Sequence, residues 1–221
     1  MTFFRVLFFS AIIFYGDTVS HLMAQPADTL LTAAERGDIG RVRTLAGDKA
    51  TIDARDAQGR TALLIATHRN DIAMAQTLIA AGADVNAKDA IQDSPYLYAA
   101  AEGRLEILRL TLAAGADLAS VNRYGGTGLI PAAHHGHIDT VRELLKTSIA
   151  IDHVNRLGWT ALLEAVILGD GGPTYVEIVH MLVNAKANVN LADSNGVSPL
   201  AHAERRNFRE IALVLRASGA N

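Results

Sequence analysis

Apolar residues recur along this chain with a fixed period. From about residue 28 onward, short alanine-rich runs alternate with runs rich in leucine, isoleucine and valine, and polar turns separate them. Thr61, Ser94, Thr127 and Thr160 open the alanine-rich runs at 33-residue intervals, and Ser198 follows after 38. Self-similarity at this interval predicts a stack of similar helical units rather than one closed core.

Each unit predicts a turn, a short helix, a break and a second helix. The turns have the form Asx-x-x-Gly, as in Asp56 to Gly59, and the following Thr or Ser is a natural N-cap. Alanine pairs such as Ala99-Ala100 let neighbouring first helices approach closely. Aliphatic runs such as Leu144-Leu145 and Leu213 to Leu215 predict the buried stripe of the second helices.

These motifs resemble the ankyrin-repeat family. Gly59-x-Thr61-Ala62-Leu63, Gly82 to Ala87 and Gly136-His137 match its signature, and the stretches around Asn122 and Asn155 are similar to small bacterial members. The resemblance implies an all-α solenoid of six helix-turn-helix units with β-turn fingers, forming one domain over residues 25–221. Counting back 33 residues from Thr61 gives Asp28, so we place the units at about 26–54, 55–87, 88–120, 121–153, 154–191 and 192–221.

The sequence departs from the family pattern at several places. Gln92 replaces the turn glycine of unit three and Pro131 lies where a helix should already run, so we expect local distortion at both. Five extra residues within Gly169–Tyr175 form either a tolerated loop insertion or a contact loop. The histidine of the family motif is replaced in every unit, by Leu31, Leu64, Leu97, Ile130, Leu163 and Ala201.

The N-terminus has a different pattern. A single basic Arg5 precedes the apolar run Val6–Tyr15, which is shorter than a membrane-spanning helix needs. Residues 1–24 are therefore predicted to be a signal peptide cut after Ala24, with Ser20 as the second choice. This places the mature protein in the periplasm or outside the cell. An uncleaved anchor, which would make the chain a membrane-tethered adaptor, and a buried first helix remain alternatives.

Composition removes several function classes. The chain has 221 residues, of which 50% are hydrophobic, and a net charge of −3, which argues against disorder and against an electrostatic pull toward nucleic acid. The absence of cysteine excludes a disulfide scaffold, a thiolate zinc site and a cysteine nucleophile. We expect a monomer that needs no cofactor, binds no nucleic acid, and does not bind membranes after signal cleavage.

The resemblance implies binding of a protein partner through a concave face made by the turn tips and first helices. Arginine, tyrosine and tryptophan are the residue types that anchor such interfaces, although an ordinary solvated face remains the alternative. The predicted binding residues are Arg60, His68, Arg69, Arg123, Tyr124, His134, His135, Arg156, Trp159, Arg205 and Arg206. Further positions on the same strip are Gln58, Ile91, Asp93, Glu102, Leu157 and Asn195.

Other chemistries have weaker signals. Adjacent His134 and His135 point about 100° apart on a helix, which does not favour a shared metal. The glycine-rich stretch Tyr124–Gly128 lacks the Lys-Ser/Thr of a phosphate loop, and common hydrolase motifs are absent. We therefore expect no enzyme. A small-molecule or phosphate site around Arg123 and Gly125–Thr127, with or without catalysis, is the runner-up.

One acidic residue qualifies the expectation of no catalysis. Glu164 falls within a predicted first helix, and we expect its side chain to be partly exposed. A buried Glu164 or Asp170 with a shifted pKa in a cleft would reopen the enzymatic interpretation.

Overall fold

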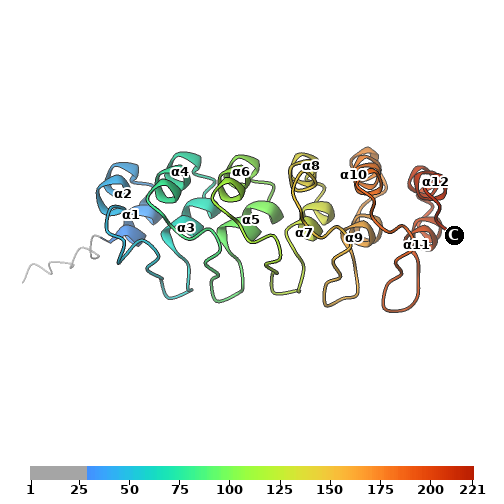
Figure 1. Ribbon diagram of the computed structural model, residues 1–221, viewed down its shortest axis with the longest axis horizontal. Coiled ribbons are helices and arrows are strands. Elements are labelled where there is room, and N and C mark those ends of the chain that lie inside the picture. The colour runs from blue at the N-terminus through green and yellow to red at the C-terminus, as the bar shows by residue number, and fades with distance from the viewer. Residues whose placement is uncertain (1–28) are drawn as a thin grey trace, which may run out of the picture.

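The computed structural model of the chain describes residues 29–221, which form six consecutive helix pairs (Figure 1). The predicted signal peptide, residues 1–24, lies outside the described residues. The first helices of the pairs are α1 (Leu30–Arg36), α3 (Ala62–His68), α5 (Pro95–Ala101), α7 (Leu129–His134), α9 (Ala161–Leu168) and α11 (Pro199–Arg205). The second helices are α2 (Ile39–Leu45), α4 (Ile72–Ala80), α6 (Leu105–Ala113), α8 (Ile138–Leu144), α10 (Pro173–Asn184) and α12 (Arg209–Ala217).

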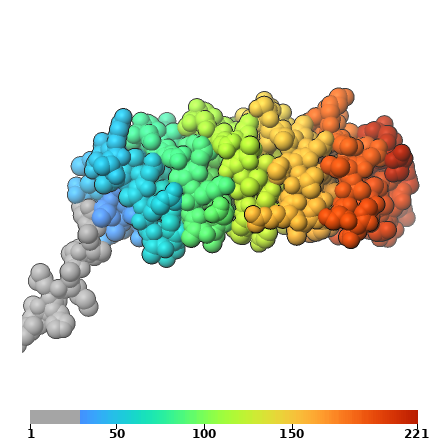
Figure 2. Space-filling view, turned by 60° about the horizontal axis from the view of Figure 1, so that its bottom comes forward, coloured from blue at the N-terminus to red at the C-terminus, as the bar shows by residue number. Residues whose placement is uncertain are grey.

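The pairs stack along one axis in two layers. The first helices form one layer and the second helices the other, and the turn before each first helix of units two to six projects as a finger (Figure 1). Figure 2 looks further toward the finger side, where the units follow one another in chain order. Residues 29–221 contain no β-strand, so the predicted all-α solenoid is confirmed. In the same residues no helix has the length and apolar character to cross a bilayer.

Side-chain caps fix where most first helices begin. The hydroxyls of Thr61, Thr160 and Ser198 accept a hydrogen bond from the third residue of their helices, as predicted. In unit one the N-cap is Thr29, one residue later than the 33-residue interval indicates, and Thr32 completes a capping box with it. Thr32, not Leu31, therefore occupies the position of the family's histidine.

The two irregular positions behave differently. Gln92 adopts a φ of +69°, close to the +79° of Gly59, so its turn keeps its shape in a backbone region that side chains disfavour. Pro131 has no N–H to donate to the carbonyl of Thr127, which instead accepts from Ile130 at 3.1 Å. As a result α7 begins after Gly128, and the buried Thr127 hydroxyl has no hydrogen-bond partner.

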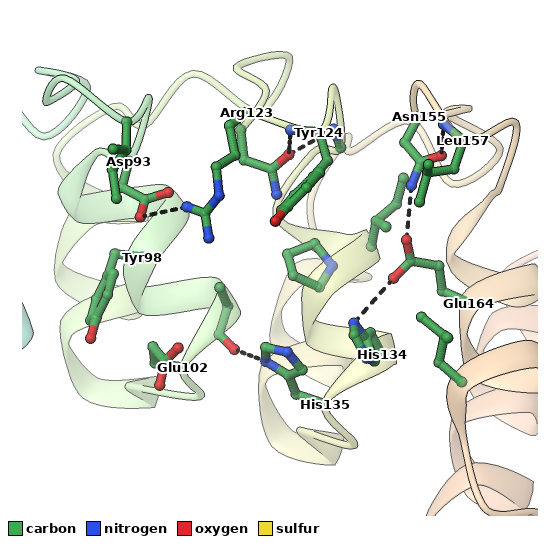
Figure 3. A pocket seen from close by; sticks show the side chains of 17 residues that line it. Asp93, Tyr98, Glu102, Arg123, Tyr124, His134, His135, Asn155, Leu157 and Glu164 are labelled. Carbon is green, nitrogen blue, oxygen red and sulfur yellow. Dashed lines mark hydrogen bonds and ion pairs between the residues drawn. The ribbon is translucent and has the colours of Figure 1, made fainter.

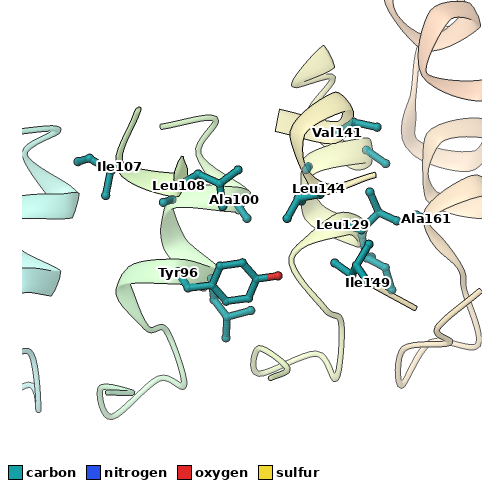
Figure 4. Packing of buried hydrophobic residues seen from close by; sticks show 14 of the residues in the cluster. Tyr96, Ala100, Ile107, Leu108, Leu129, Val141, Leu144, Ile149 and Ala161 are labelled. Carbon is teal, nitrogen blue, oxygen red and sulfur yellow. The ribbon is translucent and has the colours of Figure 1, made fainter. Parts of the chain in front are cut away.

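The core runs between the layers and from unit to unit. Alanine pairs such as Ala99-Ala100 and Ala132-Ala133 are fully buried, as predicted. Figure 4 shows Ala100 among the packed residues of this core. Tyr96 fills the space beside α7, where a Cβ on Gly128 would lie 3.0 Å from the tyrosine oxygen, so a larger residue there would displace Tyr96. The expectation that Leu213 belongs to the buried stripe is wrong, because 63% of it is exposed on α12.

A repeated hydrogen bond joins neighbouring units. Near the end of one unit, the side-chain oxygen of an Asp or Asn accepts a hydrogen bond from a backbone N–H near the end of the next unit. The donor residue lies two residues before the position that is equivalent to the acceptor. The donor–acceptor pairs are Asp84–Asp53, Asp117–Asn86, Asn188–Asp152 and Asn221–Asn190, at 2.8–3.1 Å. Between units three and four the acceptor position is occupied by Ala119, whose methyl group cannot accept.

The five-residue insertion is held in place from both sides. The Tyr175 hydroxyl donates to the carbonyl of His134 in unit four, at 2.8 Å. Arg206 of unit six donates to the carbonyls of Ile167 and Gly169, at 2.6 and 2.8 Å. The insertion therefore links units four, five and six, and α10, which begins within it at Pro173, is 12 residues long.

Candidate functional site

A groove of about 520 Å³ lies across units three, four and five (Figure 3). Its walls are the tips of three consecutive fingers and its floor is formed by side chains of α5, α7 and α9. The residues that line the groove include Ile91, Asp93, Tyr98, Glu102, Arg123, Tyr124, His134, His135, Asn155, Leu157, Glu164 and Leu168.

Apolar side chains occupy the same position on the three fingers. Ile91, Tyr124 and Leu157 follow one another at 33-residue intervals and are 53%, 54% and 51% exposed. The matching residues of units two and six are polar, Gln58 and Asn195. Exposed large apolar residues in register mark a contact surface, and here the polar flanks set its two ends.

Arg123 is held at the rim of the groove. Its Nη1 lies 3.3 Å from Asp93 Oδ2, and its guanidinium carbon lies 5.0 Å from the centre of the Tyr124 ring. Burial raises the pKa of Asp93, and the charge of Arg123 opposes that rise. The one arginine that lines the groove therefore already has an anionic partner.

Glu164 lies at the other end of the floor. Our expectation that it is partly exposed is wrong, since only 6% of the residue is exposed. Asn155 Nδ2 donates to its Oε1 at 2.8 Å, while its Oε2 lies 3.5 Å from His134 Nδ1 (Figure 3). Burial raises the pKa of Glu164 to about 7, and the hydrogen bond from Asn155 opposes the rise.

Two histidines form the middle of the floor. Burial and the neighbouring His135 lower the pKa of His134, so its ring is neutral at pH 7. A ring nitrogen of His135 lies 2.7 Å from the carbonyl oxygen of Ala101 in unit three. Within residues 29–221 no three metal-ligating side chains are placed to hold an ion together.

The structure brings together four of the predicted binding residues, Arg123, Tyr124, His134 and His135. The three from unit two lie outside the groove. Arg60 pairs with Asp56 and Glu35, and Arg69 donates to the carbonyl of Glu35. His68 stacks on Tyr98 with 4.0 Å between ring centres.

The remaining predicted residues also lie outside the groove lining. Arg156 donates to the carbonyl of Arg123 at 3.0 Å, and Trp159 is half-buried beside its finger. Arg205 is exposed at the end of α11, and Arg206 holds the insertion.

Sequence reasoning missed part of the floor. Tyr98, Pro131 and Glu164 occupy the same position of three successive first helices, one residue after the motif histidine. Aligning that column would have pointed to the floor. It would not have revealed the burial of Glu164, which depends on α7 and the Asn155 finger.

The comparisons with known proteins agree with this architecture. Two family models match, described as ankyrin repeats (3 copies) over residues 96–193 and ankyrin repeats (many copies) over residues 30–79. The ankyrin repeat protein YahD of Escherichia coli (strain K12) is 44% identical over 57 residues, which cover 26% of this chain and 28% of that protein.

Solved structures resemble the chain over most of its length. An ankyrin repeat domain from Acinetobacter baumannii AYE is 57% identical with a TM-score of 0.85, covering 87% of this chain and 98% of its own. The ankyrin repeat protein EF0377 is 42% identical with a TM-score of 0.84, covering 89% and 100%. The ankyrin repeat domain of Bcl-3, from the IkappaB protein family, is 27% identical with a TM-score of 0.78, covering 87% and 86%.

Proposed function

Because the chain belongs to the ankyrin-repeat family, whose domains generally serve as protein–protein interaction modules, we propose that it is a non-catalytic binding module. The groove across units three to five is the proposed binding site. The partner is a protein, and the module acts as a monomer. A preformed concave surface loses little conformational entropy on docking, which suits recognition without chemistry.

The observation that carries this proposal is the row of apolar finger tips. Ile91, Tyr124 and Leu157 are each about half exposed, and they flank polar and charged side chains on the floor. Apolar anchors with polar neighbours are the usual composition of protein interfaces. Polar residues at the matching tips of units two and six limit the contact to the central three units.

Export is part of the same proposal. The basic start, the apolar run Val6–Tyr15 and Ala24 support a signal peptide and a periplasmic or secreted location. The test is the mass of the C-terminally tagged protein recovered from cell fractions. A periplasmic product beginning at Gln25 supports export, and a full-length product in the cytoplasm contradicts it.

The binding proposal is tested by capturing partners from an extract of the source cells with the tagged chain. One bait carries Arg123→Ala and Leu157→Ala together, both in the groove. The matched control carries Arg209→Ala and Leu213→Ala, which remove the same residue types from the exposed surface of unit six. We expect one protein that the control retains and the groove variant loses, with binding weakened by about 1–4 kcal/mol. Equal capture by both variants would move the site elsewhere.

A small-molecule site in the same groove is the second candidate. The observation in its favour is Glu164, whose pKa near 7 and position beside His134 would suit proton transfer. The centre suggested by the sequence fits less well, because Thr127 is buried and Gly125 packs against Arg156. A thermal-shift screen of small ligands against the natural chain and Glu164→Gln tests it. A ligand that stabilises only the natural chain would favour this candidate.

A further inference from the structure

The groove has more acidic than basic side chains. Asp93, Glu102 and Glu164 line it, and Arg123 is the one arginine or lysine among its lining residues. Arg123 is engaged with Asp93, whereas Glu102 is exposed and has no ion pair within residues 29–221. A neutral His134 adds no positive charge at pH 7. An acidic groove favours a guest that carries positive charge.

Glu164 is the buried acidic group of the groove that has too few hydrogen-bond donors and no cationic partner. Its Oε1 has a good hydrogen bond from Asn155, but its Oε2 has only His134 at 3.5 Å, beyond the usual hydrogen-bond length. A buried carboxylate without a cation or a full set of donors is costly to ionise. The matching residue of unit six, His202, lies 2.8 Å from Asp193 and so has a close hydrogen-bond partner. Glu164 therefore lacks a counter-charge that a bound guest could supply.

We propose that the groove binds a partner segment that places an arginine or lysine side chain against Glu164 and apolar side chains against Ile91, Tyr124 and Leu157. This inference rests on the proposed function and adds the chemistry of the partner. The cation meets the open Oε2 of Glu164, and Glu102 adds attraction at the far end of the groove. The apolar side chains of the partner segment cover the finger tips, which are otherwise exposed to solvent.

The test uses two pools of capped, fluorescein-labelled hexapeptides and the full chain. In the first pool the third residue is arginine and the others are leucine, valine, isoleucine or phenylalanine. In the second, citrulline replaces arginine, which removes the charge and keeps the shape. We expect the arginine pool to bind at least tenfold more tightly by fluorescence anisotropy. Equal affinity for the two pools, or binding of neither, overturns the proposal.

Variants locate the charge recognition. Glu164→Gln keeps an oxygen for Asn155 and should weaken binding of the arginine pool at least tenfold. Glu102→Gln, an exposed position that leaves folding unaffected, should weaken it about twofold to fivefold. Glu177→Gln on α10 removes the same charge outside the groove and should leave binding unchanged. Unchanged affinity in both groove variants overturns the proposal even if Glu164→Gln alters stability.

The affinity should also rise with pH. Cation binding requires ionised Glu164, so its pKa near 7 predicts about a tenfold gain from pH 6 to pH 8. His134 and His135 of α7 line the same space, and loss of a proton from His134 acts in the same direction as ionisation of Glu164. On α10 and α11, Tyr175 bonds the His134 carbonyl and His202 pairs with Asp193. The part of the affinity gain that comes from Glu164 should be absent in Glu164→Gln. If this variant shows the same pH profile as the natural chain, the proposal is overturned.

The two proposals can fail separately. A captured protein that depends on Arg123 and Leu157, together with no preference for the arginine pool, would retain the binding module and reject the cation site. Capture that does not depend on the groove, together with charge-selective peptide binding, would reject the proposed protein-binding face. The second result would leave a groove that recognises cationic groups from another source.

Discussion

Units five and six each place a polar pair at the same two backbone positions, nine residues apart. In unit six, Asp193 Oδ2 lies 2.8 Å from His202 Nε2, and backbone hydrogen bonds together with His202 lower the pKa of Asp193. In unit five the pair is Asn155 and Glu164, and burial raises the pKa of Glu164 to about 7. The same scaffold position thus holds a compensated pair in the last unit and an uncompensated acid inside the groove.

The largest difference in stability effects between the two units should come from the residue just before Glu164 and its counterpart just before His202. Leu163 is fully buried, whereas the matching Ala201 is only half-buried. Leu163→Ala should lower the free energy of unfolding by about 2–5 kcal/mol through the cavity it leaves. Ala201→Leu adds the same side chain in unit six and should change it by less than about 1 kcal/mol. Urea denaturation measures both, and equal effects would contradict the comparison.

Replacing the polar pair of unit five with the residue types of unit six tests whether the side chains, and not the backbone positions they share, cause the difference between the two pairs. Asn155→Asp keeps the oxygen that accepts from the Leu157 and Trp159 amides, but it replaces the donor to Glu164 with a second carboxylate. We expect a loss of about 2–4 kcal/mol at pH 8. Adding Glu164→His recreates the pair of unit six and should recover most of that loss. A double variant no more stable than the single one would refute this account.

The two pairs should respond to pH with opposite signs. The pKa of Glu164 rises from 4.5 to about 7 on folding, so its contribution is fully present below about pH 4.5 and is lost as the pH rises through 7. The loss is at most about 3 kcal/mol. The pKa of Asp193 is lowered, so its contribution is present above its ordinary pKa of 3.8 and is lost as the pH falls further.

Denaturation midpoints from pH 4 to pH 8 measure this effect in the natural chain and in Glu164→Gln. The natural chain should lose stability toward pH 8 relative to the variant. Parallel curves would mean that Glu164 has an ordinary pKa in the folded protein.

The smallest effect concerns the contact between the two units. Arg206→Ala removes two hydrogen bonds to the carbonyls of Ile167 and Gly169 and should lower the free energy of unfolding by about 1 kcal/mol. The adjacent Arg205 is exposed, and its side chain makes no hydrogen bond within residues 29–221, so Arg205→Ala is the matched control. Thermal denaturation should separate the two variants, and identical midpoints would argue against a linking role for Arg206.

The sequence predicted the fold because each unit repeats its own local signals. Caps such as Thr61 and Ser198 and buried alanine pairs depend on a few neighbouring residues, and they recur in register. Pro131 could be recognised as a distortion for the same reason, since its missing N–H acts within one turn. The exposure of Leu213 could not be read in this way, because it depends on which elements pack against α12 and not on the residues next to it in sequence.

The candidate site was only partly predictable. Arg123 and Tyr124 could be placed from the turn motif, because finger tips project in units two to six. Trp159 was predicted from residue type, but its position just before the helix leaves it half-buried outside the groove lining. The burial of Glu164 arises from two neighbouring elements, α7 and the finger of Asn155, which lie nine or more residues away. A local sequence pattern does not reveal contacts between elements that are distant in the sequence.

The missing hydrogen bond at Ala119 has a mechanical consequence. Backbone bonds also join the fingers of units two and three, from Ala90 to Gln58, and of units four and five, from Arg156 to Tyr124. Within residues 29–221 no equivalent bond joins units three and four, where side chains such as Lys88 and His135 make the polar links instead. Of the junctions within residues 29–221, this one alone lacks both kinds of bond, so we expect it to bend more easily than the others. Because the groove spans this junction, bending there should change the width of the groove.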